Sequence, residues 1–394
     1  MQSSALPLGY AAVVGIVGER PRPVKPCRDA CRDAVSTSTR SGSDSFFLIK
    51  WYYGFRPFRV FADPEVSLPA TIYMTGVAGF IGSHVAEALL LRGDRVFGLD
   101  NLDPFYDRSL KERNLAALSA HPGFDFTEGD IRDEAALRRW GDGAPAGALI
   151  HLAAKAGVRP SVADPIGYAD VNVTGTARVL AWARDRAVPR VLFASSSSVY
   201  GGNSKIPFAE DDPVDHPVSP YAATKKAGEL LCHAFCHLYG MNVASLRFFT
   251  VYGPRQRPEM AIRKFTRLLF EGKEIGIYGD GSTQRDYTYV DDVVAGVLGA
   301  LSAPPGHRIY NLGESATISL SDLVGLLERV TGRKAFRRFL PVQPGDVPVT
   351  YADITRARAE IGYDPKVPVA EGVERFVRWY RSNLVESTYR GGDR

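Results

Sequence analysis

From Thr71 onward, short apolar runs alternate with segments of helical periodicity, and this alternation limits the possible folds more than any other feature of the chain. Runs such as RVFGLD and RVLFAS are largely apolar at consecutive positions, which is typical of parallel strands that helices cover on both faces. The pattern predicts an α/β fold with a doubly wound parallel sheet. We expect strands at residues 71–75, 95–100, 124–128, 148–151, 190–195 and 242–248, and helices near 80–92, 109–119, 133–140, 168–186, 220–239 and 260–271.

The same alternation divides the chain into four segments. Residues 1–68 are rich in Ser, Thr and Arg, and we interpret them as a disordered leader or as a start assigned too far upstream. Their stretch LGYAAVVGIVG has no preceding basic residues and no convincing cleavage site, so we do not expect export. Residues 69–252 carry the regular alternation. Residues 253–384 mix short strands with helices, which predicts a smaller C-terminal α/β lobe that exchanges some segments with the first, and residues 385–394 would form a flexible tail.

Composition excludes several kinds of protein. The chain has 394 residues and a formal net charge of +4 that is spread along it, so we expect neither nucleic acid nor a membrane as a partner. Its four cysteines are too few for a disulfide framework, which favours a cytoplasmic location. The segment CHAFCHLY places Cys232 and Cys236, and likewise His233 and His237, one helical turn apart. We expect no metal there, because a long amphipathic helix pattern surrounds the segment and explains these residues.

A glycine-rich motif connects the first expected strand with the first expected helix. Gly76, Gly79 and Gly82 have the spacing G-x-x-G-x-x-G. Such glycines permit a tight turn and a close approach of the backbone to a pyrophosphate, which the amino end of the helix attracts. Asp100 ends the next strand, where its carboxylate would bind the ribose of NAD and repel the 2′-phosphate of NADP. The motif therefore predicts a Rossmann-type domain with NAD as its cofactor.

Further cofactor contacts are expected at the ends of the following strands. Asp130 and Ile131 come after the third strand and would border the adenine, and small residues at the end of the fourth strand leave room for the cofactor. The predicted cofactor site comprises Gly76, Gly79, Phe80, Ile81, Gly82, Asp100, Asn101, Asp130, Ile131, Leu152, Ala153 and Ala154, together with Tyr221 and Lys225.

Tyr221 and Lys225 form a candidate proton-transfer pair. They lie four positions apart, hence on one face of a helix. A free phenol titrates near ~10, so a tyrosine base at neutral pH needs a lowered pKa. We expect the positive charges of Lys225 and of an oxidised nicotinamide to supply it. Ser196, in the serine run that ends the fifth strand, would share the reacting oxygen of the substrate with Tyr221.

In this order the motifs resemble the extended short-chain dehydrogenase/reductase family, which includes nucleotide-sugar epimerases and dehydratases. The resemblance covers residues 71–382 and includes the later stretches RFFTVYGPRQRPEMA and RDYTYVDD. It implies NAD-dependent chemistry on a nucleotide sugar, with Ser196, Tyr221 and Lys225 as the catalytic residues. It also implies a homodimer, because the segments 168–186 and 220–239 resemble the helices of the family's dimeric four-helix bundle.

The residues after Ser196 favour epimerisation over elimination. The family's 4,6-dehydratases have an Asp-Glu pair there, whereas this chain has Ser197 and Ser198, so no carboxyl group is available for elimination. Thr250 and Arg257 resemble residues of the UDP-glucuronate 4-epimerases, in which such residues hold the sugar carboxylate. The predicted substrate site comprises Ser197, Ser198, Thr250, Arg257, Met260 and Arg285, the last of which resembles the family's pyrophosphate-binding arginine.

The sequence therefore predicts NAD-dependent 4-epimerisation of UDP-glucuronate to UDP-galacturonate through a 4-keto intermediate. One departure concerns the loop GPRQRPEMA, which places Arg255 where the glucuronate epimerases often read GPWGRPDMA. Several alternatives stay open on the same scaffold: a UDP-glucose/UDP-galactose 4-epimerase, a UDP-glucuronate decarboxylase and other NAD-dependent sugar-nucleotide oxidoreductases. A non-catalytic binding protein is a further alternative, although Ser196, Tyr221 and Lys225 are all present.

Overall fold

The structure of the chain is a computed structural model that describes residues 70–342 and 347–389. The expected leader, residues 1–68, lies outside these ranges, as do Cys27 and Cys31. Within the two ranges, no helix has the length and apolar character that crossing a membrane requires.

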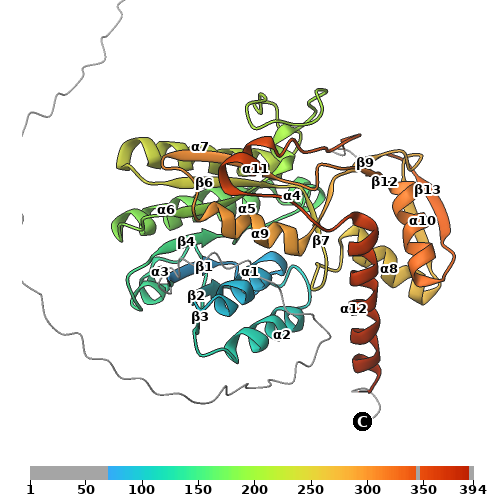
Figure 1. Cartoon of the computed structure of the whole chain (residues 1–394), viewed down its shortest axis with the longest axis horizontal. Coiled ribbons are helices and arrows are strands. Elements are labelled where there is room, and N and C mark those ends of the chain that lie inside the picture. The colour runs from blue at the N-terminus through green and yellow to red at the C-terminus, as the bar shows by residue number, and fades with distance from the viewer. Residues whose placement is uncertain (1–69, 343–346, 390–394) are drawn as a thin grey trace, which may run out of the picture. The chain divides into compact units, whose positions relative to one another are not determined.

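A seven-stranded parallel sheet forms the centre of the described chain. Its strand order is β3-β2-β1-β4-β5-β6-β11, so the chain winds outward in both directions from the boundary between β1 and β4 (Figure 1). Ligands bind at such a boundary in open α/β sheets, and the order confirms the predicted Rossmann-type fold. The strands are β1 (Thr71–Thr75), β2 (Arg95–Asp100), β3 (Phe124–Glu128), β4 (Ala148–His151), β5 (Val191–Ser196), β6 (Val243–Phe248) and β11 (His307–Leu312).

Helices cover both faces of this sheet, as the apolar strands require. Buried residues of α1, α2 and α9 pack on one face, and those of α3, α6 and α7 pack on the other (Figure 1). The first group is α1 (Phe80–Leu91), α2 (Arg108–Ser119) and α9 (Val290–Ala300), and the second is α3 (Glu134–Gly141), α6 (Thr176–Asp185) and α7 (Pro220–Tyr239).

Two elements differ from the sequence-based expectation. The single helix expected at 168–186 consists of α5 (Pro165–Ala169), a π-helical turn (Asp170–Gly175) and α6, in direct succession. The strand β11, at one edge of the sheet, was not expected: its first three residues are only half-buried, and polar residues interrupt its apolar ones in HRIYNL. Its apolar run is therefore too short to stand out in the sequence.

Short strand pairs and helices form the remainder, and α8, α10, α12 and β13 lie to the right of the main sheet in Figure 1. The segment 253–384 supplies most of these elements. However, its strand β11 is part of the main sheet and its helix α9 packs on that sheet. The division into two lobes therefore stays a prediction. Helix α12 continues to Tyr389, into the segment predicted as a tail. The pairs are β7 (Thr250–Tyr252) with β10 (Tyr287–Tyr289), β8 (Glu274–Tyr278) with β13 (Phe336–Leu340), and β9 (Gln284–Arg285) with β12 (Ile318–Ser319). The helices are α4 (Val158–Ala163), α8 (Ala261–Glu271), α10 (Leu320–Thr331), α11 (Thr355–Ile361) and α12 (Val369–Tyr389).

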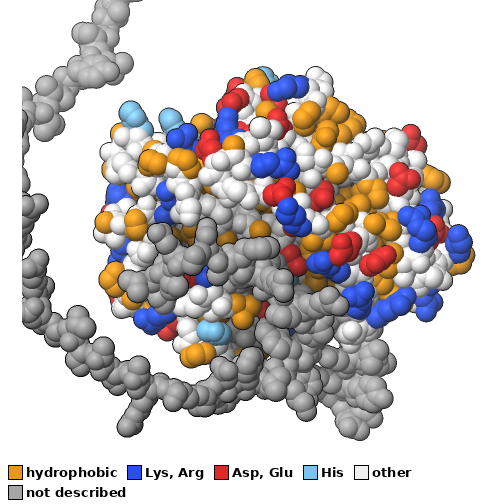
Figure 2. Space-filling model, in the orientation of Figure 1, with side chains coloured by type: hydrophobic (Ala, Val, Ile, Leu, Met, Phe, Trp, Pro, Cys, Tyr) orange, Lys and Arg blue, Asp and Glu red, His pale blue; other side chains and the backbone are white. Residues whose placement is uncertain are grey.

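Charges of both signs share the surface. On the face shown in Figure 2, Lys and Arg side chains are interspersed with Asp and Glu side chains, and apolar side chains lie between them. This mixture agrees with the small net charge of +4.

Candidate active site

A cleft of about 580 Å³ opens at the carboxyl ends of the central strands. It is lined by residues that follow or end β1, β2, β3, β4, β5 and β6, the position at which a doubly wound sheet binds ligands. Every residue that we assigned to the site from the sequence lines this cleft, apart from Arg285.

The glycine loop at the start of the cleft has no room for side chains. Gly76 has a φ of +73°, and a Cβ atom there would lie 2.7 Å from the backbone nitrogen of Ala153. A Cβ atom at Gly82 would lie 2.1 Å from the carbonyl oxygen of Gly76. Helix α1 begins at Phe80, directly after Gly79, and Gly82 lies in its first turn. The free N–H groups of this turn therefore face the loop. The loop thus fits a pyrophosphate bound against bare backbone.

Asp100 bonds the backbone of two loops and lines the cleft at the end where we expect the adenosine part of NAD. Its carboxylate accepts hydrogen bonds from the backbone nitrogens of Ala78 (3.1 Å) and Leu102 (2.8 Å), and Lys111 Nζ lies 3.8 Å away. Burial raises the pKa of Asp100, while the charge of Lys111 and the two backbone hydrogen bonds oppose that rise. Asp100 therefore joins the glycine loop to the strand β2.

Asp130 lies beside Asn101 at the same end of the cleft. Asn101 Nδ2 donates to Asp130 Oδ2 at 2.9 Å. Hydrogen bonds from Arg132 lower the pKa of Asp130 to about 2, so this carboxylate is ionised at neutral pH. The pair gives the cleft fixed polar groups where the adenine and its ribose were expected.

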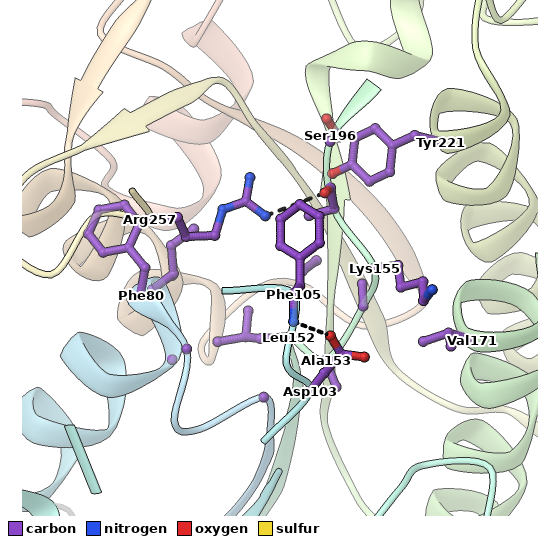
Figure 3. Close-up of a pocket in the computed structure, with 18 of the residues that line it drawn as sticks. Phe80, Asp103, Phe105, Leu152, Ala153, Lys155, Val171, Ser196, Tyr221 and Arg257 are labelled. Atoms are coloured by element: carbon purple, nitrogen blue, oxygen red, sulfur yellow. Dashed lines mark hydrogen bonds between the residues drawn. The ribbon is translucent and has the colours of Figure 1, made fainter. Parts of the chain in front are cut away.

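Ser196, Tyr221 and Lys225 meet at the opposite end. Tyr221 is the second residue of α7, whose start is fixed by a hydrogen bond from the Ala222 nitrogen to Ser219 Oγ at 3.1 Å. Lys225 Nζ lies 6.0 Å from the centre of the Tyr221 ring and donates to the carbonyl oxygen of Ala194 at 2.8 Å. Figure 3 shows Ser196 and Tyr221 next to one another at this end of the cleft.

The titration of this pair differs from our expectation. Burial raises the pKa of Tyr221, although a hydrogen bond with Ser196 and the charge of Arg257 oppose the rise. Burial also lowers the pKa of Lys225 to about 8. The protein groups alone therefore do not lower the pKa of Tyr221 as we expected, because the effect of burial is larger than that of the groups that oppose it.

The four serines of the run have different neighbours. Ser195 Oγ donates to Glu229 Oε1 at 2.6 Å, and Glu229 is paired with the buried Arg247, so this serine is part of the core. Ser196 Oγ accepts from the backbone nitrogen of Ser198 and donates to its Oγ, both at 3.2 Å. That contact caps the short 3₁₀ turn Ser197–Tyr200 and directs Ser197 and Ser198 into the cleft.

Arg257 brings a positive charge into the cleft. Its Nε atom pairs with Glu259 Oε1 at 3.0 Å, and its Nη1 atom donates to the carbonyl oxygen of Ala156 at 3.4 Å. The guanidinium lies 5.8 Å from the ring centre of Phe105, toward which it points in Figure 3. Met260 Sδ, which also lines the cleft, accepts from Arg257 Nη2 at 3.5 Å.

Arg285 lies in a neighbouring cavity of about 190 Å³. Ser197, Ser198 and Thr250 line both this cavity and the main cleft, so the two spaces are adjacent. The structure thus places Arg285 beside the expected sugar site but outside the cleft that holds the other residues.

Comparison with known proteins identifies the family. The profile of the NAD dependent epimerase/dehydratase family matches residues 72–313. The chain belongs to this family. A UDP-glucuronate 4-epimerase of Thermodesulfobacterium geofontis is 44% identical over 79% of this chain and 96% of its own length. The UDP-glucuronate 4-epimerase 2 of Arabidopsis thaliana is 43% identical over 79% of this chain and 75% of its own length.

The chain is also similar to a solved structure. The UDP-glucuronic acid 4-epimerase of Bacillus cereus, in complex with UDP-glucuronic acid and NAD, is 34% identical and has a TM-score of 0.75. The match covers 79% of this chain and 99% of that one. NAD is the cofactor of this chain. The bare glycine loop and a carboxylate at Asp100, which lines the cleft after the second strand, fit it.

Several cleft residues of this epimerase/dehydratase chain were not found from the sequence. Phe105 and Tyr106 come from the loop after β2, and Lys155 and Tyr168 follow β4. The only signal for them was their position after the carboxyl end of a strand. Within residues 70–342 and 347–389, no three His, Cys, Asp or Glu side chains are grouped to hold a metal ion.

Proposed function

We propose that the chain catalyses the NAD-dependent 4-epimerisation of UDP-glucuronate to UDP-galacturonate. One observation carries the proposal: the guanidinium of Arg257 and the hydroxyl groups of Ser197, Ser198 and Thr250 line the same cleft as the Tyr221/Lys225 pair. A guanidinium with short hydroxyl donors suits a carboxylate, whereas a neutral hydroxymethyl group would not need the charge.

The protein groups divide the acid–base work between them. NAD, when bound, supplies the hydride acceptor and donor for C4 of the sugar. Tyr221, as phenolate, takes the proton of the 4-hydroxyl group and later returns it, and Ser196 holds the same oxygen by a hydrogen bond. Lys225 would bind the nicotinamide ribose and favour the phenolate by its charge. The 4-keto sugar would have to turn about its link to the pyrophosphate so that its opposite face is presented for reduction.

The carboxylate needs restraint because the intermediate is a β-keto acid, which can lose CO2. We propose that Ser197, Ser198, Thr250 and Arg257 keep the carboxylate away from the geometry in which its C–C bond aligns with the carbonyl π system. Arg285 would bind the pyrophosphate, and Met260 would line the sugar site. In this scheme residues 69–252 mainly bind NAD and residues 253–384 mainly bind the nucleotide sugar.

Proton NMR of the purified protein with UDP-glucuronate and, separately, UDP-glucose tests the substrate assignment. Formation of UDP-galacturonate alone supports the proposal, and activity without added NAD would indicate that the cofactor is tightly held. UDP-galactose as the product would contradict the sugar assignment and keep the mechanism. A pentose product would make the chain a decarboxylase, an alternative that Ser197 and Ser198 disfavour because neither has a carboxyl group.

We also propose that the chain acts as a cytoplasmic homodimer. Apolar side chains lie exposed on neighbouring helices: Ile166 of α5 is 82% exposed, Leu230 of α7 is 57% and Leu238 of α7 is 66%. Such side chains are expected where two copies pack α5–α6 and α7 into a four-helix bundle. Light scattering should give twice the mass of the chain, and Leu230→Asp should shift it toward the monomer, whereas a wild-type monomer would contradict the proposal.

A further inference from the structure

The loop that carries Arg257 is bound from outside the cleft by the cofactor-side helix α1. Arg255 Nη2 and Glu87 Oε2 form an ion pair at 2.5 Å, and their side chains are only 20% and 31% exposed. One residue earlier, the carbonyl oxygen of Pro254 lies 3.0 Å from His84 Nε2. His84 and Glu87 lie one turn apart on α1, so two consecutive loop residues are bound by one face of this helix.

The hydrogen bond from His84 has a defined direction. Burial, together with the positive charge of Arg255, lowers the pKa of His84 to about 3, so the imidazole is neutral at physiological pH. A carbonyl oxygen only accepts hydrogen bonds, and therefore we assign the proton to Nε2, which donates to Pro254. The charge of Arg255 is consequently met by Glu87 and, further away, by Asp291 of α9.

Arg255 occupies an unfavourable position that its partner must offset. Its φ of +62° lies in the left-handed region, which costs free energy for a residue with a side chain. Its Nη1 atom is buried without a hydrogen-bond partner among the described residues. The loop runs close to α9 at Gly253, where a Cβ atom would lie 2.6 Å from the Val290 side chain. The Glu87 carboxylate is thus the main group that keeps the Arg255 side chain in place.

The next loop residue is also fixed outside the cleft. Gln256 is fully buried, its Nε2 atom donates to the carbonyl oxygen of Val251 at 3.1 Å, and its own carbonyl oxygen accepts from Arg263 of α8. Arg257 is therefore the first residue of this stretch whose side chain enters the cleft. Its side chain has its own contacts to Glu259 at 3.0 Å and to the Ala156 carbonyl oxygen at 3.4 Å, and the backbone anchors fix the position from which this side chain extends.

We propose that Glu87 and Arg255 are positioning residues for Arg257, through which they act on the substrate carboxylate. The inference rests on the proposed function. Neither residue lines the cleft, so we expect neither to touch the substrate or NAD. The ion pair joins the helix whose amino end faces the cofactor to the loop that binds the sugar acid. A shift of this loop by a fraction of an ångström would move the guanidinium out of register with the carboxylate.

Steady-state kinetics of the full-length protein with UDP-glucuronate tests this inference. In Glu87→Gln, which keeps the size of the side chain, we expect the KM for UDP-glucuronate and the Ki for UDP-galacturonate to rise together by about fivefold, the effect of a half-buried ion pair. Arg255→Gln leaves the backbone strain unchanged and removes the same ion pair, while Asp291 keeps Arg375 as its partner, so the rise should be at least as large. The Ki for UDP, which has no carboxylate, should stay at the wild-type value in both variants.

A matched control separates positioning from a general loss of charge. Glu271→Gln removes a carboxylate that pairs with Arg267 and Lys273 outside the cleft and should leave all three constants unchanged. Because Glu87 and Arg255 act as one unit, the double variant should be no worse than Arg255→Gln alone. Should Glu87→Gln fail to fold, Glu87→Asp, which shortens the reach, is measured in its place.

Two outcomes would overturn the inference. Folded variants with unchanged constants would show that Arg257 needs no such anchor, and an equal rise in the Ki for UDP would assign the pair to nucleotide binding or to general stability. Failure of the proposed function is visible separately, because wild-type protein would then form no UDP-galacturonate.

Discussion

At the scale of single residues, Tyr221 is the group on which the chemistry depends most. Tyr221→Phe removes the hydroxyl group and keeps the ring, so we expect unchanged NAD content and a loss of kcat by about 10²- to 10⁴-fold, the usual contribution of a positioned acid–base group. Tyr168→Phe removes the hydroxyl group of a neighbouring cleft residue, 6.2 Å away, which donates to the Ala156 backbone oxygen, and should lower kcat far less than Tyr221→Phe. Full activity of Tyr221→Phe in the NMR assay would exclude Tyr221 as the base.

Arg257 is the residue on which the identity of the sugar depends. Arg257→Ala removes the charge that would face the carboxylate, and the KM for UDP-glucuronate should rise about 10- to 100-fold, as for a lost hydrogen bond to a charged group. Pentose by-product should increase, because the β-keto acid is less restrained. Arg257→Lys keeps the positive charge but lacks the planar guanidinium, so its KM for UDP-glucuronate should lie between those of the wild type and Arg257→Ala. Unchanged uronate kinetics in Arg257→Ala would contradict the carboxylate assignment.

The positions of these residues could be predicted from the sequence, but their electrostatics could not. Ser196 and Arg257 belong to motifs that follow strands, and strand ends of a parallel sheet meet at one edge. Burial, in contrast, depends on the packing of the whole cleft, and it raises the pKa of Tyr221 in spite of Ser196 and Arg257. Phe105 was missed for the same reason: a loop residue enters a cleft through tertiary packing, which no local pattern encodes.

At the scale of elements, the start of α7 sets the geometry of the catalytic pair. Ser219 caps this helix, and Tyr221 follows two residues later. Ser219→Ala should reduce the free energy of unfolding by about 1 kcal/mol, the usual cost of losing an N-cap. We also expect a lower kcat, because the first turn that carries Tyr221 would fray. Chemical denaturation and NMR turnover measure the two effects.

Ser319 provides a matched control for this prediction. It caps α10, where its Oγ accepts from the Asp322 nitrogen at 3.0 Å, and it lies outside the cleft. Ser319→Ala should cost about the same stability and leave kcat unchanged. Equal kcat values in the two variants would mean that the cap of α7 has no catalytic role.

Elements were predictable where their apolar pattern is complete. Six strands of the main sheet were expected within one residue of their observed bounds, because they are buried along most of their length or follow strong turn signals. The strand β11 is half-buried and was missed, and the π-helical turn at Asp170–Gly175 has no distinctive pattern within a helical segment. Whether a strand lies at the edge of a sheet, and whether a helical turn is α or π, depends on residues that are close in space but distant in the sequence.

At the scale of the whole molecule, a buried histidine couples stability to pH. His151 is 2% exposed and lies between Thr75 Oγ1 at 2.6 Å and Thr176 Oγ1 at 3.0 Å. Thr176 already donates to the carbonyl oxygen of Asn172, so His151 Nε2 donates to Thr176 and Nδ1 accepts from Thr75. Both ring nitrogens are satisfied in the neutral form, and burial lowers the pKa of His151 to about 3.

The sign of the pH dependence follows from this lowered pKa. Above the ordinary histidine pKa of 6.5, His151 is neutral in both the folded and the unfolded chain, and the full stability is present. As the pH falls below 6.5, the unfolded chain binds a proton that the folded chain excludes, so the free energy of unfolding decreases until the pH approaches 3. Buried carboxyl groups oppose this trend, because burial raises the pKa of Asp286 and Asp291 to about 6.

A comparison with His151→Gln isolates the histidine from these carboxyl groups, which both proteins share. Glutamine cannot titrate, so the stability of the variant relative to wild type should improve by about 2 kcal/mol between pH 7 and pH 5, as expected for a proton bound only in the unfolded state. Urea denaturation at the two pH values measures this difference. A constant gap between the two proteins would mean that the folded chain accepts the proton on His151, and the assigned neutral hydrogen-bond network would be wrong.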